Sequence, residues 1–254
     1  VGGYTGQGVR GEVCDSGLRT THADFQAIPV LMHTVNGAST SHGTSTYGQV
    51  FGDGASDPTS RGCLPDAQGI FAAYNSLPNR YVHTGELVQA PYNAVFQTNS
   101  WGNARTFFYT TVSADMDNML FDHDIVITQS QSNAGNQDSR PQAWAKNIVS
   151  GGGIRHYDTL TTSDDAWSGG ASIGPASDGR IKPDLSAFYD SIRTTSSTDD
   201  TSHTSTFGGT SGATPIIAGQ FGLFFQMWSN GVFNNLPTGA TVFDARCHMT
   251  TAKA

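Results

Sequence analysis

Residues 208–228 read GGTSGATPIIAGQFGLFFQMW and carry the clearest signal for the fold. From residue 212 onward it is almost wholly apolar and predicts a long buried helix. Pro215 fits the first helical turn, because its missing N–H would be unpaired there in any case. Ser211 is therefore expected at the helix N-terminus. Gly209 and Gly212 lie close to it in the sequence and leave room for another chain to approach its hydroxyl.

Outward from this helix, apolar strands and helical patterns alternate along the chain. This alternation predicts a parallel sheet covered on both faces, with functional groups at the carboxyl ends of the strands. The polar stretch TQSQSN (128–133) fits such a sheet poorly and is interpreted as either a loop or a strand edge lining a polar pocket. The expected strands are 8–17, 69–74, 93–102, 124–129 and 147–153, and the expected helices are 42–54, 109–121 and 212–228.

Composition excludes several classes of function. The 254 residues carry a net charge of −8 and contain no Lys/Arg cluster, so nucleic acid is not expected as a partner. No apolar run reaches the ~20 residues of a membrane span. Charged residues make up only 13%, and the surface is expected to be rich in Asp, Ser, Thr and Gly, which is typical of secreted proteins. The start VGGYTGQGVRG (1–11) is interpreted as a processed one.

The chain has three cysteines, Cys14, Cys63 and Cys247. Three thiols cannot all pair within one chain, and their spacing fits no zinc site. A disulfide framework is therefore not expected to hold this fold, and small buried side chains are the favoured interpretation.

Two further motifs carry polar side chains suited to catalysis. CDSGL (14–18) places Asp15 at the end of an expected strand, and SHGTS (41–45) places His42 at the start of an expected helix. A serine nucleophile needs an adjacent base, and the base needs a third group to fix its tautomer. Asp15, His42 and Ser211 supply one of each, so hydrolysis through a catalytic triad is the leading hypothesis.

The motif SNAGNQD (132–138) adds a candidate oxyanion donor. A side-chain amide at the end of a strand can donate a hydrogen bond to the tetrahedral oxyanion, as can backbone N–H groups at a helix N-terminus. Asn136 is chosen for this role, together with the backbone N–H of Ser211.

Taken together, these motifs resemble the subtilisin-like serine proteases, the subtilase family. DSG at Asp15, HGT at His42, AGN at Asn136 and GTSGATP at Ser211 match the family's motifs in the family's order. The resemblance covers about residues 8–228. NSWG (99–102) and GRIKPD (179–184) are similar to segments of the alkaline branch of the family.

The resemblance implies a three-layer α/β fold, with a mainly parallel sheet of about seven strands between helices, in one catalytic domain over residues 1–254. It implies a secreted, monomeric endopeptidase acting on proteins or peptides. Substrate contacts are expected at Ser100, Trp101 and Gly102, and at Ala134 and Gly135. The ending HMTTAKA (248–254) suggests a truncated or nicked domain, which a further C-terminal segment or chain would complete.

The chain departs from the family pattern at several positions. Ser45 stands where a second histidine is usual, and Gly212 where methionine is usual. SAFYDS (186–191) replaces the usual segment after KPD, and TQSQSN replaces an apolar strand. These differences leave the expected triad complete but make the substrate preference unreadable.

The chemistry is expected to need no cofactor, whereas the resemblance allows structural calcium. Three acidic pairs could supply oxygen ligands, but none has a complete spaced ligand set, so solvated loops are favoured and no metal residue is assigned. The pairs are Asp53 with Asp57, Asp164 with Asp165, and Asp199 with Asp200.

Rival functions remain open from the sequence. An α/β-hydrolase esterase would use Asp244 and His248 after Ser211, but its Gly-x-Ser-x-Gly turn fails at Ala213. A transpeptidase or macrocyclase on the same scaffold would pass the acyl group to an amine instead of water. The non-enzyme rival is a pseudoprotease that binds peptides.

Overall fold

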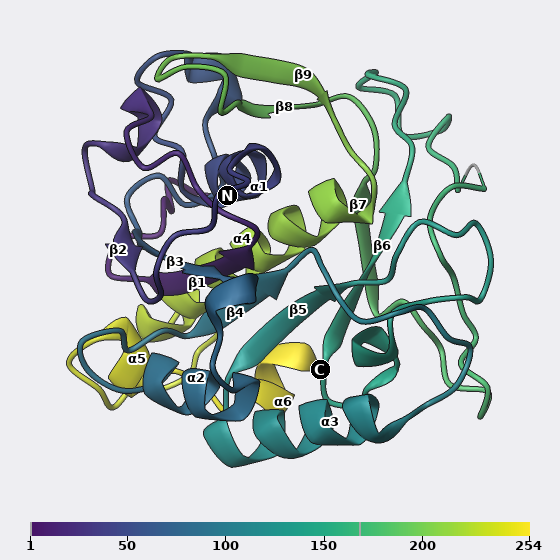
Figure 1. Cartoon of the computed structure of the whole chain (residues 1–254). Coiled ribbons are helices and arrows are strands. Elements are labelled where there is room, and N and C mark those ends of the chain that lie inside the picture. The colour runs from purple at the N-terminus through teal and green to yellow at the C-terminus, as the bar shows by residue number, and fades with distance from the viewer. Residues whose placement is uncertain (1, 168) are drawn as a thin grey trace.

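Seven parallel strands form the central sheet, in the order β2-β3-β1-β4-β5-β6-β7 (Figure 1). The computed structural model describes residues 2–167 and 169–254. This arrangement confirms the α/β fold and its seven-stranded sheet. The strands are β1 (Arg10–Asp15), β2 (Leu31–Met32), β3 (Gln68–Ala73), β4 (Phe96–Asn99), β5 (Val126–Ser130), β6 (Val149–Ile154) and β7 (Leu185–Phe188).

Helices cover both faces of this sheet (Figure 1). Helices α1 (Ser41–Phe51) and α4 (Thr210–Ser229) lie on one face, and α2 (Arg80–Leu87) and α3 (Thr111–His123) lie on the other. The sheet is thus the middle of three layers, as expected. Two short helices follow near the C-terminus, α5 (Val242–Ala245) and α6 (Met249–Lys253).

Apolar side chains fill the space between the layers. Phe71 and Phe96 on the sheet are 0% exposed, and Phe225 of α4 is 1% exposed. Helix α4 packs across β4, β5, β6 and β7, which explains why its sequence is apolar around most of its circumference. The rigid core therefore fixes the position of residue 211 at the N-terminal end of this helix.

The polar stretch 128–133 begins as a central strand. Thr128, Gln129 and Ser130 are buried in β5, which pairs with β4 on one side and β6 on the other. The interpretation of this part as a loop is therefore wrong. The strand ends at Ser130, and the chain leaves the sheet over the following residues.

Several elements were not expected from the sequence. Helix α2 contains Gly85 and two charged residues, and β2 has only two residues, so neither gives a clear periodic signal. A separate antiparallel pair, β8 (Ile192–Thr195) and β9 (His203–Phe207), is rich in threonine and lies near α1 (Figure 1).

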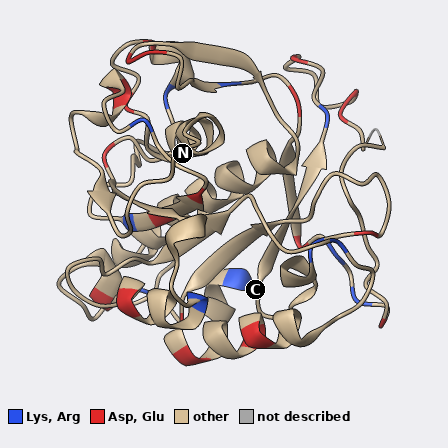
Figure 2. Ribbon diagram, in the orientation of Figure 1, with Lys and Arg blue, Asp and Glu red and all other residues tan. Residues whose placement is uncertain are grey.

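Charged side chains are scattered over the ribbon, and Lys and Arg form no continuous stripe (Figure 2). Among the described residues, no helix combines the length and apolar character needed to cross a membrane. All three cysteines are free, and Cys14 is buried within β1.

Candidate active site

Asp15 and His42 form a directly hydrogen-bonded pair. Asp15 is the last residue of β1 and is 2% exposed, while His42 lies in the first turn of α1. The Nδ1 atom of His42 lies 2.8 Å from Oδ1 and 3.0 Å from Oδ2 of Asp15. Two more donors hold the carboxylate: the backbone N–H of Ser16 at 2.7 Å and the hydroxyl of Thr46 at 3.1 Å. The carboxylate is thereby fixed as the group that orients the imidazole.

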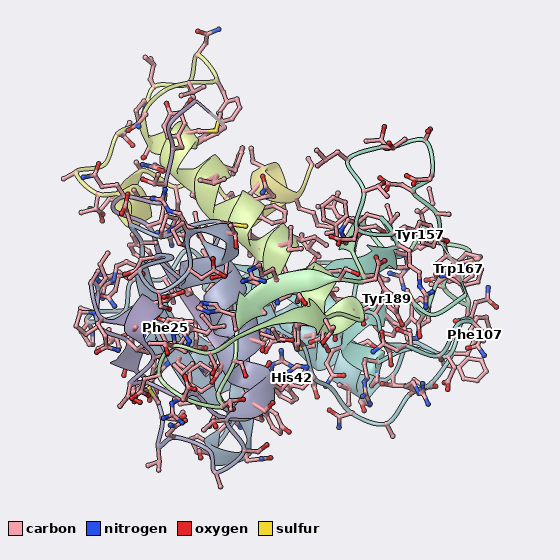
Figure 3. All side chains as sticks on the ribbon, turned by 90° about the horizontal axis from the view of Figure 1, so that it is seen from above. Phe25, His42, Phe107, Tyr157, Trp167 and Tyr189 are labelled. Atoms are coloured by element: carbon pink, nitrogen blue, oxygen red, sulfur yellow. The ribbon has the colours of Figure 1, made fainter. Side chains whose placement is uncertain are left out.

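The same contact raises the pKa of His42. Burial alone would lower it, but the hydrogen bond and the negative charge of Asp15 outweigh that effect. The side chain of His42 is still 38% exposed, so its second nitrogen can be reached from the cleft. Figure 3 shows His42 near the middle of the face seen from above, with Tyr189, Trp167 and Phe107 to one side.

Backbone contact fixes the spacing between β1 and α1. A Cβ atom on Gly43 would lie 2.1 Å from the carbonyl oxygen of Gly17. One on Gly17 would lie 2.5 Å from the oxygen of Gly37, and one on Gly37 would lie 1.7 Å from the oxygen of Ser16. Side chains at these positions are excluded, so Gly17, Gly37 and Gly43 (here called the glycine contact) lock the segments carrying Asp15 and His42.

Ser211 is the second residue of α4, as predicted, and it contacts Ser100 just beyond β4. The Ser100 hydroxyl donates to the backbone carbonyl of Ser211 at 3.0 Å, and the Ser211 hydroxyl donates to the carbonyl of Ser100 at 3.4 Å. In this structure the Ser211 hydroxyl thus bonds to the strand end and makes no hydrogen bond to His42. Rotation about its Cα–Cβ bond would redirect it.

A cleft of about 380 Å³ joins several of the predicted residues. Asp15 and His42 lie on its wall together with Ser100, Trp101 and Gly102. Three of the five predicted substrate contacts therefore lie beside the Asp–His pair. The remaining lining residues are Ser16, Ser39, Tyr74 and Arg140.

Asn136 is not placed as expected. Its side chain is exposed, and its amide oxygen accepts a hydrogen bond from the backbone N–H of Asp138 at 2.7 Å, so it closes a local turn. The neighbouring Ala134 and Gly135 bond to Ser172 and Gly170 and do not line the cleft described above.

Asn133 instead lies against the start of α4. Its amide oxygen accepts from the backbone N–H of Thr210 at 2.9 Å and from the Thr210 hydroxyl at 3.2 Å. Because the oxygen is used in this way, the Nδ2 group has no hydrogen-bond partner among the described residues and lies near Gly209, two residues before Ser211. Asn133 lies three residues after the end of β5 and within the motif SNAGNQD, where its position beside AGN gave no separate signal.

One departure from the family pattern, Ser45, and one segment that matches it, GRIKPD, both have structural roles. Ser45 donates its hydroxyl to the carbonyl of Thr195 at 2.8 Å and ties α1 to β8. In the GRIKPD segment, Lys182 forms an ion pair with Asp184 at 2.7 Å, and Asp184 also accepts from the backbone N–H and hydroxyl of Ser150. Burial lowers the pKa of Lys182 to about 8 despite the nearby carboxylate. This segment therefore fastens β6 to β7.

Asp244 and His248, the residues that an esterase would use, have structural roles in this fold. Asp244 accepts from the Thr241 hydroxyl at 2.8 Å at the start of α5. His248 caps α6 through the backbone N–H of Thr250 and lies 3.4 Å from Asp124. Neither belongs to the cleft that holds His42.

Acidic side chains that could bind calcium form ion pairs and hydrogen bonds in loops. Asp57 pairs with Arg193, Asp200 pairs with Arg19, and Asp53 accepts from the backbone of Ala55. Within residues 2–167 and 169–254, only one group of three ligating side chains comes together, and it contains none of these acids: Glu12, His33 and His83. The calcium expectation stays a prediction.

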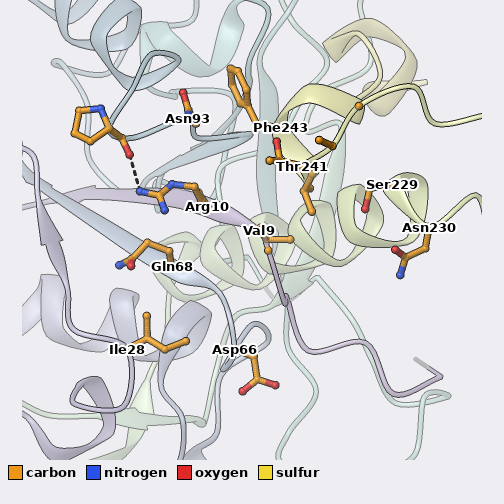
Figure 4. A pocket seen from close by; sticks show the side chains of 15 residues that line it. Val9, Arg10, Ile28, Asp66, Gln68, Asn93, Ser229, Asn230, Thr241 and Phe243 are labelled. Atoms are coloured by element: carbon orange, nitrogen blue, oxygen red, sulfur yellow. Dashed lines mark hydrogen bonds between the residues drawn. The ribbon is translucent and has the colours of Figure 1, made fainter.

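Another hollow lies away from the Asp–His pair (Figure 4). It has a volume of about 700 Å³ and opens at the first residue of β1, Arg10, whereas Asp15 ends the same strand. Arg10 donates there to the carbonyl of Pro91 at 2.7 Å. No pair of an acid and a histidine lines this hollow, so it is not the candidate catalytic site.

Known proteins share the family and the fold of this chain. The model of the subtilase family matches residues 6–238. A solved cold-adapted subtilisin-like serine proteinase is 21% identical, with a TM-score of 0.63 over 96% of this chain and 81% of that one. The prenylagaramide maturation protease PagA is 17% identical, with a TM-score of 0.67 over 95% of this chain and 89% of that one.

The self-cleaved protease domain of PatA is also 17% identical, with a TM-score of 0.68 over 98% of this chain and 97% of that one. At these identities the solved structures show the fold alone. A search of curated proteins gives no match. The family match spans most of the chain, and so the chain belongs to the subtilase family and is a serine peptidase.

Proposed function

We propose that the chain is an endopeptidase that hydrolyses peptide bonds through an acyl-enzyme on Ser211, with His42 as general base and Asp15 as the residue that orients it. The observation that carries this proposal is the Asp15–His42 hydrogen bond at 2.8 Å on the wall of a cleft. The cleft also contains Ser100, which is hydrogen-bonded to Ser211 at the start of α4.

The hydrogen bond between His42 and Asp15 determines which imidazole nitrogen takes part in proton transfer. Because Nδ1 of His42 bonds to Asp15, its Nε2 is the nitrogen left to accept the proton of Ser211. The Ser211 hydroxyl first turns away from the carbonyl of Ser100. Its oxygen then bonds to the carbonyl carbon of the substrate as the proton moves to Nε2, and the carbonyl oxygen becomes an oxyanion.

The second half of the reaction returns the proton. The oxyanion reforms the carbonyl, the peptide C–N bond breaks, and His42 gives its proton to the departing amine. Water then attacks the ester on Ser211 with His42 again as base, and the acid product leaves. Asp15 stays ionised throughout and stabilises the imidazolium.

We assign the side-chain oxyanion donor to Asn133 in place of Asn136. A donor must lie beside the nucleophile, and Asn133 is held there by two hydrogen bonds from Thr210. The backbone N–H of Ser211 is the second donor, because the first N–H groups of a helix have no intrahelical partner.

Secretion, a monomeric state, action on protein substrates and membership of the alkaline branch are further parts of this proposal. The low charged fraction of 13% and the net charge of −8 support an extracellular protein. The segments NSWG and GRIKPD support the alkaline branch.

The test compares wild type with Ser211→Ala on denatured casein and on a peptide ester, with fluorophosphonate labelling. Wild type is expected to cleave both substrates and to be labelled at Ser211, while the variant does neither. His248→Gln is the control for the esterase mechanism and should keep full activity. Peptide products that have lost water would reveal transpeptidation, and an unlabelled wild type would indicate a peptide-binding pseudoprotease.

A further inference from the structure

A second cluster of ionisable side chains lies on the other face of the sheet. Glu12 is three residues before Asp15 on β1, so the two side chains point to opposite faces. Glu12 meets His83 of α2 and His33, which follows β2 directly. Glu12 is 0% exposed, and the side chains of both histidines are 2% exposed.

Close contacts hold this cluster together. His33 Nδ1 lies 2.7 Å from Oε2 of Glu12, and His83 Nε2 lies 2.9 Å from Oε1. Gln97, the neighbour of Glu12 on β4, donates to Oε1 at 2.7 Å. Three separate segments thus converge on a single buried carboxylate.

Both ring nitrogens of His33 face a carboxylate. Its Nδ1 faces the carboxylate of Glu12, and its Nε2 lies 3.4 Å from the carboxylate of Glu86. A neutral imidazole carries one N–H, so one nitrogen would present a lone pair to a carboxylate. Either a second proton or a metal ion resolves this conflict.

The position of His83 favours the metal ion. The rings of His33 and His83 stack with their centroids 3.8 Å apart, so protonating both would bring two positive charges face to face. A single divalent cation would bind one nitrogen of each histidine and an oxygen of Glu12 at once. The N–H of His33 would then remain on Nε2 and point to Glu86, which is the usual way a carboxylate orients a metal-binding histidine.

We propose that Glu12, His33 and His83 bind a divalent transition-metal ion of the zinc type. The ligand atoms are one oxygen of Glu12, Nδ1 of His33 and Nε2 of His83, and all lie within 4.8 Å of one another. Two imidazoles with one carboxylate form a known zinc ligand set, with metal–ligand bonds of about 2.0–2.2 Å. The role is structural, because the cluster lies on the sheet face opposite Asp15 and ties β1, α2 and the segment after β2 together.

The test uses the Ser211→Ala protein to prevent self-digestion. The purified protein is stripped with EDTA, and thermal unfolding is recorded before and after addition of Zn²⁺. Co²⁺ is then titrated and followed by its visible absorption, which is intense for four-coordinate sites. One zinc per chain, a lower melting temperature after stripping and its recovery with Zn²⁺ are expected.

Glu86→Gln is the most informative variant, because the Glu86 side chain is 59% exposed and its replacement leaves the buried ligands unchanged. Loss of its carboxylate should weaken Co²⁺ binding about 10–100-fold. His83→Gln should abolish binding, and His248→Gln is the matched control for a histidine near a carboxylate outside the cluster. No bound metal, no effect of EDTA on melting and no saturable Co²⁺ spectrum would overturn the proposal and leave a protonated imidazole as the charge.

Discussion

The side chain of Asn133 is hydrogen-bonded to both the N–H and the hydroxyl of Thr210, the residue just before Ser211. These two hydrogen bonds fix the position of the Asn133 amide relative to the N-terminus of α4. The free Nδ2 group is therefore held in place before substrate arrives, which is the condition under which a hydrogen-bond donor lowers a barrier most.

Replacing Asn133 with Ala should lower kcat about 10²–10³-fold, the loss measured for one such donor in subtilisin. KM should change little, because the donor acts on the oxyanion and not on the bound substrate. Asn136→Ala is the matched control and should keep near-normal kcat, since Asn136 only closes a turn. Equal losses in the two variants, or a loss confined to Asn136→Ala, would return the role to Asn136.

Activity should fall on acidification, with its midpoint above the ordinary histidine pKa of 6.5. The base must be neutral, and Asp15 raises the pKa of His42, so protonation begins at a higher pH than for a free imidazole. The profile of kcat/KM against pH measures this midpoint in the free enzyme.

Asp15→Asn should lower kcat about 10⁴-fold. The acid midpoint of the remaining activity should move to lower pH, because burial, which lowers the pKa of His42, is then no longer opposed by a carboxylate. An unchanged midpoint would mean that the profile reports another group.

Gly43→Ala should lower both stability and activity. The new Cβ would meet the carbonyl oxygen of Gly17 at 2.1 Å, and a backbone oxygen cannot rotate away as a side chain can. Overpacking of this kind costs about 1–3 kcal/mol and should shift His42 relative to Asp15. Urea unfolding and kcat measure the two effects. Ser41→Ala, at the exposed start of the same helix, should alter neither by a comparable amount.

Asp184→Asn should lower the free energy of unfolding by up to about 3–5 kcal/mol near neutral pH, because Lys182 is left buried without its partner and must either keep an unpaired charge or release its proton. The deficit should shrink as the pH rises, because burial favours the neutral amine and its deprotonation removes the unpaired charge. Asp178→Asn, which removes an exposed ion pair with Arg180, should change the free energy of unfolding much less. Denaturant unfolding at several pH values separates these outcomes.

Much of the site could be predicted because its signals are local. Asp15, His42 and Ser211 each lie in a short motif at an element end, and β1, α1 and α4 begin or end there as expected. The misplaced residue was Asn136. The end of β5 could not be located from its sequence, because the buried Thr128, Gln129 and Ser130 look like loop residues.

The cluster around Glu12 could not be found from the sequence for a different reason. His33 and His83 are 50 positions apart, and both belong to segments without a periodic pattern. Only the order of the strands, which brings β2, β3 and β1 side by side, lets them meet Glu12. The one available signal was Glu12 itself, a charged residue between Gly11 and Val13 in the middle of an expected strand.

The glycine contact limits how this enzyme can evolve. Because backbone atoms alone set the spacing between the segments of Asp15 and His42, no exchange of side chains at Gly17, Gly37 or Gly43 can adjust it by small steps. Selection for a new substrate must therefore act on the rim of the cleft, at residues such as Tyr74 and Arg140, which line it. Variant libraries directed to the rim should yield altered specificities, whereas those directed to the three glycines should yield mainly inactive protein.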